Sequence, residues 1–122
     1  MKSGRIAVAV IILLLTVSLY AWMEGSRCLG LWSDGYWYPA TVVKAEAGVY
    51  FVAFDDGDSA SVNESGIRAI DWRIGTYIQC NWKRKGAYYP GRITAMIGES
   101  IHVSYDDGDE EDTSIGMCRS RP

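Results

Sequence analysis

The stretch Phe54-Asp55-Asp56-Gly57-Asp58 decides the fold, because a near copy, Tyr105-Asp106-Asp107-Gly108-Asp109, stands 51 positions later. In both stretches an aromatic residue ends an apolar run and is followed by Asp-Asp-Gly. Aspartate and glycine tolerate the positive φ angles that tight hairpin turns require. The sequence therefore predicts the same β-hairpin twice.

The match extends upstream of both hairpins. Tyr38-Pro39 reappears as Tyr89-Pro90 at the same spacing, and Trp32 matches Trp82 if the second copy has one extra residue in its first loop. Self-similarity over such a length indicates two copies of one structural unit.

Each copy contains five short segments typical of strands, rich in β-branched and aromatic residues and separated by turn residues. In the first copy we expect strands ending at Trp32 and spanning 37–45, 49–54, 59–62 and 67–70. Five strands this short cannot form a sandwich but can close into a small barrel, which removes exposed edges. We therefore expect an all-β protein with two tandem five-stranded barrels, at 26–71 and 75–120, with Trp72 filling the space between them.

A different kind of segment precedes the repeats. Ile6 to Trp22 is an uncharged apolar run, near the short end of the lengths that span a bilayer. No good small-residue cleavage site follows it, so we favour a retained transmembrane anchor, residues 1–25, over a cleaved signal peptide. Lys2 and Arg5 precede the run, which keeps the N-terminus cytoplasmic and places the barrels on the extracytoplasmic side. Secretion after cleavage is the alternative.

Charge and motifs narrow the functional class. All 15 acidic residues follow the apolar run, so the repeats are acidic and lack the basic footprint of a nucleic-acid binder. No nucleophile stands with a base, and no glycine-rich loop is placed to hold phosphate, so we expect no catalytic residues and no cofactor. Cys80 and Cys118 fall on the first and last strands of one barrel, which are neighbours in a closed barrel. A disulfide between them is one option, and it requires an oxidising compartment.

The repeat resembles a Tudor domain, present twice, on the strength of the tryptophan, the Tyr-Pro pair and the aromatic-Asp-Asp-Gly-Asp hairpin. The resemblance covers almost everything after residue 26 and is shared with agenet domains of the same SH3-like barrel superfamily. In Tudor domains that bind methylated lysine or arginine, the ligand enters an aromatic cage. By position, the resemblance implies a first cage of Trp32, Tyr38, Phe54, Asp56 and Asp58, and a second cage of Trp82, Tyr89, Tyr105, Asp107 and Asp109.

This composition suits a cationic ligand. A methylated ammonium keeps its charge but is easily desolvated, so aromatic faces attract it, and a carboxylate can accept any remaining N–H. Many cages have a further aromatic residue near the hairpin glycine, where this chain has Asp58 and Asp109. The cages are therefore expected to be more open and more acidic, which favours dimethylated, unmodified or simply basic ligands over trimethyl-lysine.

Each candidate residue also has a structural interpretation. Trp32 and Trp82 could be core residues, and the aspartates could serve only the turns. Strand alternation sends Trp37 and Tyr38 to opposite faces without saying which residue lies inside. The carboxylates from Asp106 to Asp112 are expected to form a solvated acidic edge rather than a calcium site, and His102 a packed or surface residue.

The resulting hypothesis is a membrane-anchored, non-enzymatic module that binds a protein or peptide carrying cationic or methylated side chains. The resemblance implies nuclear or cytoplasmic ligands, whereas the flanking charges place the barrels across a membrane. Two alternatives stay open: a cell-envelope module that binds wall peptides, and a structural accessory subunit of a membrane complex.

Overall fold

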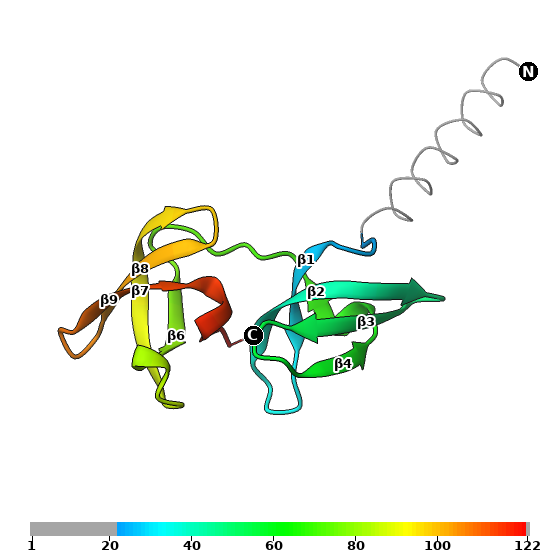
Figure 1. Cartoon of the computed structure of the whole chain (residues 1–122), viewed down its shortest axis with the longest axis horizontal. Helices are drawn as coiled ribbons and strands as arrows, with labels where there is room; N and C mark the ends of the chain where they lie inside the picture. The colour runs from blue at the N-terminus through cyan, green and yellow to red at the C-terminus, as the bar shows by residue number, and fades with distance from the viewer. Residues whose placement is uncertain (1–21, 122) are drawn as a thin grey trace, which may run out of the picture.

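The computed structural model describes residues 22–121 and contains two five-stranded antiparallel sheets, as the repeat predicts (Figure 1). Barrel 1 has the strand order β4-β3-β2-β1-β5, and barrel 2 the order β10-β6-β7-β8-β9. The strands of barrel 1 are β1 (Arg27–Leu31), β2 (Trp37–Glu46), β3 (Val49–Phe54), β4 (Ser59–Val62) and β5 (Ile67–Arg68). Those of barrel 2 are β6 (Tyr77–Asn81), β7 (Tyr88–Ile97), β8 (Ser100–Tyr105), β9 (Glu110–Ser114) and β10 (Cys118–Arg119).

Short 3-10 helices connect some of these strands: η1 (Glu64–Gly66), η2 (Trp82–Arg84) and η3 (Ile115–Met117). The strand predicted for 67–70 is shorter than expected and ends at Arg68. It pairs only with β1, at two positions, and the chain then leaves the sheet toward the linker. Among residues 22–121 no helix is long and apolar enough to span a membrane, and the predicted anchor, residues 1–25, lies outside the described residues except for residues 22–25.

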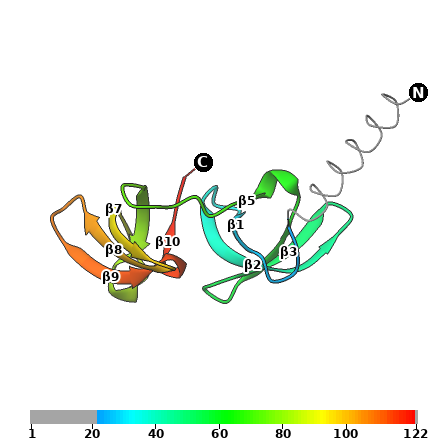
Figure 2. The same ribbon diagram turned by 90° about the horizontal axis from the view of Figure 1, so that it is seen from above.

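Each barrel has a β-bulge in its longest strand. The pairing register shifts between Val42 and Lys44 in β2, and between Ile93 and Ala95 in β7. These are equivalent positions of the repeat, and a β-bulge there increases strand bend and twist. Each long strand can therefore curve from one side of its barrel to the other (Figure 2).

The barrels are joined by a common core. Ile78, Ile93, Val103 and other buried side chains of barrel 2 form one cluster with Leu29 and Trp37 of barrel 1 and Trp72 of the linker. Trp72 is 5% exposed, which confirms the prediction that it fills the space between the barrels. A separate cluster in barrel 1 contains Cys28, Ala40, Val42, Val52, Phe54 and Ile67.

Main-chain and charged contacts reinforce this interface. The backbone N–H and C=O groups of Trp37 and Ser120 exchange two hydrogen bonds, of 2.8 and 3.0 Å. Arg27 of barrel 1 bridges Asp55, at 2.7 Å, and Glu99 in the β7–β8 turn, at 2.9 Å. Because both barrels contribute to one core and one ladder bridge, their relative position is fixed by packing, and a residue of one barrel can reach a site in the other.

Candidate functional site

The five residues predicted for the first cage border one cavity of about 180 Å³ in barrel 1. Trp32 follows β1, Tyr38 lies in β2 and Phe54 ends β3, while Asp56 and Asp58 come from the hairpin between β3 and β4. The tight turn therefore brings carboxylates over a surface that the strands line with aromatic rings. We call this group, with its cavity, cage 1.

The rings of cage 1 form walls rather than a stack. The ring centroids of Trp32 and Phe54 are 5.4 Å apart with an interplanar angle of 85°, and those of Tyr38 and Phe54 are 6.2 Å apart at the same angle. Edge-to-face packing is a favourable aromatic arrangement. It also leaves ring faces available to a cation in the cavity.

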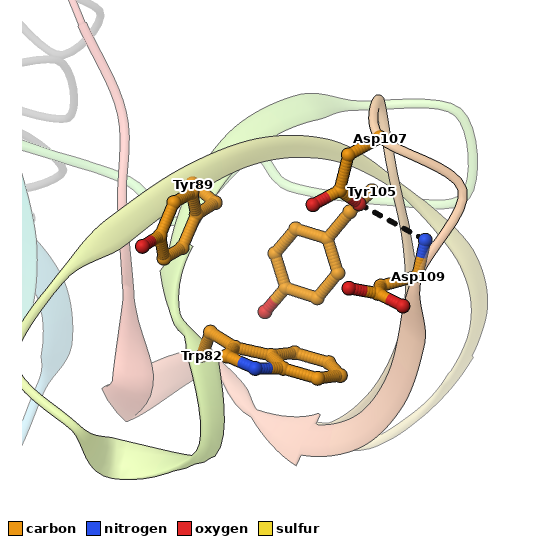
Figure 3. A pocket seen from close by; sticks show the side chains of 5 residues that line it. All are labelled: Trp82, Tyr89, Tyr105, Asp107 and Asp109. Carbon is orange, nitrogen blue, oxygen red and sulfur yellow. Dashed lines mark hydrogen bonds between the residues drawn. The ribbon is translucent and has the colours of Figure 1, made fainter.

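Barrel 2 repeats the arrangement. The residues predicted for the second cage border a cavity of about 170 Å³, here called cage 2: Trp82, Tyr89, Tyr105, Asp107 and Asp109 (Figure 3). The rings of Trp82 and Tyr105 are 5.3 Å apart and nearly perpendicular, at 89°. In the picture Tyr89 and the two aspartates stand on either side of these rings.

The aspartates serve both the turn and the cavity. Asp56 Oδ1 accepts a hydrogen bond of 3.0 Å from the backbone N–H of Asp58, and Asp107 Oδ1 accepts one of 2.9 Å from that of Asp109. These contacts have the form of the local turns that favour aspartate. The turn and ligand interpretations are thus compatible, since a carboxylate has a second oxygen.

Two of the cage tyrosines, Tyr38 and Tyr105, have raised pKa values and are neutral at physiological pH. Burial, followed by the hydrogen bond to Asp34, raises the pKa of Tyr38 to about 12. Burial, followed by the 2.6 Å hydrogen bond from its hydroxyl to Glu111 Oε1, also raises the pKa of Tyr105. The negative charge of both cages therefore comes from the aspartates, and the tyrosines contribute ring faces.

The structure resolves the choices that the sequence left open. Trp32 and Trp82 are only partly buried, so each packs against a core and also lines a cavity. Trp37, in contrast, is buried in the interface between the barrels, and its neighbour Tyr38 faces cage 1. In barrel 2, Tyr89 lines its own cage.

One cage residue was missed by sequence reasoning. Tyr88 of barrel 2 lines cage 1, across the interface, and its ring centroid lies 6.3 Å from that of Tyr38. Tyr88 is the repeat equivalent of Trp37, which also points at the opposite barrel. The equivalence is visible in the sequence, but the sequence does not say that either residue lies at the interface between the barrels.

Two of the cysteines lie on neighbouring strands, as predicted for the first and last strands of a barrel. Cys80 and Cys118 are opposite each other in the β6–β10 pairing and are joined in a disulfide. Cys28 is a buried free thiol in barrel 1, and burial raises its pKa to about 11. Cys28 is therefore protonated at physiological pH and packs as a core residue.

The acidic edge of barrel 2 holds the single histidine. His102 Nδ1 is 2.7 Å from Asp112 Oδ1, and Nε2 is 3.4 Å from Glu110 Oε1. Within residues 22–121, no three His, Cys, Asp or Glu side chains are grouped to hold a metal ion. The edge therefore consists of carboxylates in solvent with one histidine paired to them.

The comparisons with known proteins agree with this geometry. Residues 25–70 match the family model described as the DNA repair protein Crb2 Tudor domain. The whole structure resembles the crystal structure of Crb2 tandem tudor domains, with a TM-score of 0.57 and 19% sequence identity, covering 79% of this chain and 77% of that one. The fold is that of a tandem Tudor domain.

Two further solved structures are more distant. The structure of Arabidopsis thaliana AGDP1 AGD34 has a TM-score of 0.44 and 13% identity, covering 87% of this chain and 86% of that one. The ADCP1 tandem Agenet domain 3-4 has a TM-score of 0.43 and 14% identity, covering 87% and 84%. No curated protein matches the chain in sequence.

Proposed function

We propose that this chain, with its tandem Tudor fold, is a non-enzymatic binding module that holds cationic side chains of a protein ligand, methylated lysine or arginine among them, in cages 1 and 2. The observation that carries the proposal is that two copies of the repeat assemble the same three aromatic positions and two aspartates around cavities of nearly equal volume. Packing alone does not explain why both copies keep a cavity lined by the same residue types.

The size and charge of the cavities fit one side-chain head group. Volumes of about 170 and 180 Å³ are well below the roughly 300–1,000 Å³ of pockets that enclose drug-sized ligands. Aromatic faces attract a desolvated cation, and the two aspartates of each cage add Coulombic attraction. The chain's own Lys83 illustrates the first effect, since its Nζ lies 4.8 Å from the ring centroid of Trp82.

The proposal is tested by NMR titration of the full 122-residue chain in detergent micelles, which keep the apolar N-terminal run soluble. The titrants are peptides carrying unmodified, dimethylated or trimethylated lysine, or dimethylated arginine. The indole N–H signals of Trp32 and Trp82 report on the cages, and that of Trp72, buried between the barrels, is the internal control.

Saturable shifts of Trp32 or Trp82 with methylated peptide, and none at Trp72, are expected. If neither cage signal moves at millimolar peptide, the proposal fails, and purified wall material and candidate membrane complexes become the next ligands to test. Larger shifts with trimethyl-lysine than with dimethyl-lysine or unmodified peptide would contradict the preference that two aspartates in each cage predict.

We also propose that the apolar run 6–22 tethers the module to a membrane, on the basis of its length and flanking charges. Fractionation of cells that express the tagged chain tests the tether. Protease protection of the barrels in sealed vesicles then tests their side of the membrane. Recovery of the intact chain in the soluble fraction would contradict the proposal.

A further inference from the structure

Cage 1 has a wall that its own barrel does not supply. Tyr88 of β7 borders the cavity, and its ring meets that of Tyr38 edge to face, at 84°. Cage 2 receives no such residue from barrel 1 among those that line its cavity. The shape of cage 1 therefore depends on how Tyr38 and Tyr88, from different barrels, are held relative to each other.

Arg119 of β10 lies between these two tyrosines. Its Cζ is 4.1 Å from the ring centroid of Tyr88 and 3.8 Å from that of Tyr36. Its Nη1 donates a hydrogen bond of 3.0 Å to the hydroxyl oxygen of Tyr38, and its Nε donates one of 3.0 Å to Gln79 Oε1. One guanidinium thus stacks on a residue of barrel 2 and is bonded to a cage residue of barrel 1.

The charge of Arg119 is balanced at the same place. Asp34 Oδ2 lies 3.8 Å from Arg119 Nη1 and accepts a 2.6 Å hydrogen bond from the hydroxyl of Tyr38. The side chain of Arg119 is only 20% exposed. A guanidinium with aromatic faces, a carboxylate and two directed hydrogen bonds has little freedom to move.

The backbone of Arg119 is held on both sides. Cys118 precedes it and is bonded to Cys80, while Ser120 follows it and pairs with Trp37 of barrel 1. The side chain of Arg119 therefore extends toward the tyrosines from a strand that is fixed in place and ends at the interface between the barrels.

We propose that Arg119 is a positioning residue of cage 1: it holds Tyr38 and Tyr88, contributed by different barrels, in the orientation that closes the cage. This inference rests on the proposed function of that cage. It makes ligand affinity at cage 1 depend on the docking of the two barrels, whereas affinity at cage 2 depends on barrel 2 alone.

Arg68 provides a matched control for a purely structural role. It also joins the barrels, because its Cζ is 4.2 Å from the ring centroid of Trp37 and its Nη2 is 3.4 Å from Ser120 Oγ. The ring contact and hydrogen bonds of Arg68, to Trp37, Ser120 and Arg121, involve no residue that lines either cage. Arg68→Ala should therefore weaken barrel docking in general, and Arg119→Ala should in addition disturb Tyr38 and Tyr88.

The experiment repeats the peptide titration on the full chain with Arg119→Ala, Arg119→Lys and Arg68→Ala, and records melting temperatures. Arg119→Ala should raise the Kd at Trp32 about three- to tenfold, the range expected from losing one or two aromatic contacts. The Kd at Trp82 should not change. Arg119→Lys should recover little, because lysine keeps the charge but not the planar fork.

A second measurement needs no ligand. In the free wild-type protein, nuclear Overhauser contacts between the rings of Tyr38 and Tyr88 are expected, and Arg119→Ala should weaken them while Arg68→Ala does not. Unchanged ring contacts and unchanged affinity at Trp32 in Arg119→Ala would overturn the inference. So would equal losses at both cages, or equal effects of Arg68→Ala. A wild type that binds nothing at Trp32 would instead refute the function proposed for cage 1, and the ring contacts alone would then decide the positioning role.

Discussion

Cages 1 and 2 are built from the same repeat positions but are not equal sites. Cage 1 lies at the interface between the barrels and is bordered by Tyr88 of barrel 2, whereas the residues that line cage 2 all come from barrel 2, and Tyr89 among them is 45% exposed. The comparison teaches that the local sequence specifies the kind of site, while the tandem arrangement decides which barrels contribute to each copy.

The contacts of Phe54 in cage 1 and of its equivalent Tyr105 in cage 2 also differ. In barrel 1, Gly30 leaves space for Phe54, whose ring would be 3.0 Å from a Cβ placed on that glycine. In barrel 2 the equivalent residue is Cys80, which is bonded to Cys118, and Tyr105 takes the place of Phe54 and bonds to Glu111. Phe54 is thus held by close packing against barrel 1, whereas Tyr105 is held by a hydrogen bond in a barrel that also contains a disulfide.

Removing the disulfide, which has no counterpart in barrel 1, should have the largest effect on this comparison. The bond closes a loop of 38 residues, and its loss in Cys80→Ser/Cys118→Ser should lower the free energy of unfolding by about 2–4 kcal/mol. Urea unfolding of the wild type with and without reductant measures the effect. Reductant should not affect the double variant, and an identical transition for oxidised and reduced wild type would contradict the prediction.

Truncating one tryptophan should separate the two cages functionally. Trp32→Ala should weaken binding at cage 1, and Trp82→Ala at cage 2, by about 2 kcal/mol, or about thirtyfold in Kd. The two variants are controls for each other, and titration calorimetry with the preferred peptide measures both. If either variant melts far below the wild type, that tryptophan is chiefly a core residue.

Filling the space beside Gly30 should disturb cage 1 by displacing the ring of Phe54. Gly30→Ala places a methyl group against Phe54 and should cost about 1–3 kcal/mol of stability, as overpacking does. Binding at cage 1 should weaken and binding at cage 2 should not. A double-mutant cycle with Phe54→Leu should recover part of the stability, and strictly additive effects would count against direct contact.

The smallest effect concerns the acidic edge of barrel 2, which barrel 1 lacks. The hydrogen bond to Asp112, followed by the charges of Asp112 and Glu110, raises the pKa of His102 above its ordinary 6.5. The paired imidazolium therefore stabilises the folded state fully below that ordinary value, and the contribution disappears as pH rises through the raised pKa.

His102→Phe, which introduces the residue of the equivalent position in barrel 1, tests this pH dependence. Melting temperatures between about pH 5 and about pH 8 should decline more for the wild type than for the variant. Parallel profiles would show that the pair contributes nothing measurable.

Local patterns were sufficient to predict much of the fold, and the resemblance to Tudor domains supplied the expected members of both cages. The Asp-Asp-Gly turns and the apolar run from Val49 to Phe54 each depend on neighbouring residues, so they can be read from a short window of sequence. Some predicted strand ends were wrong: β1 ends at Leu31 instead of Trp32, and β5 ends at Arg68 instead of Ile70.

The sequence by itself determined the repeat, its strands and its hairpins, since alternation and turn preferences act over a few residues, and the members of each cage were implied by the resemblance to Tudor domains. The tertiary structure alone decided that Tyr88 borders cage 1, that Arg119 lies between tyrosines of both barrels, and that Trp37 is buried where Tyr38 is not. These contacts join residues far apart in the chain, and they depend on the relative orientation of two docked barrels. That orientation is set by the shared core around Trp72 and has no local signature.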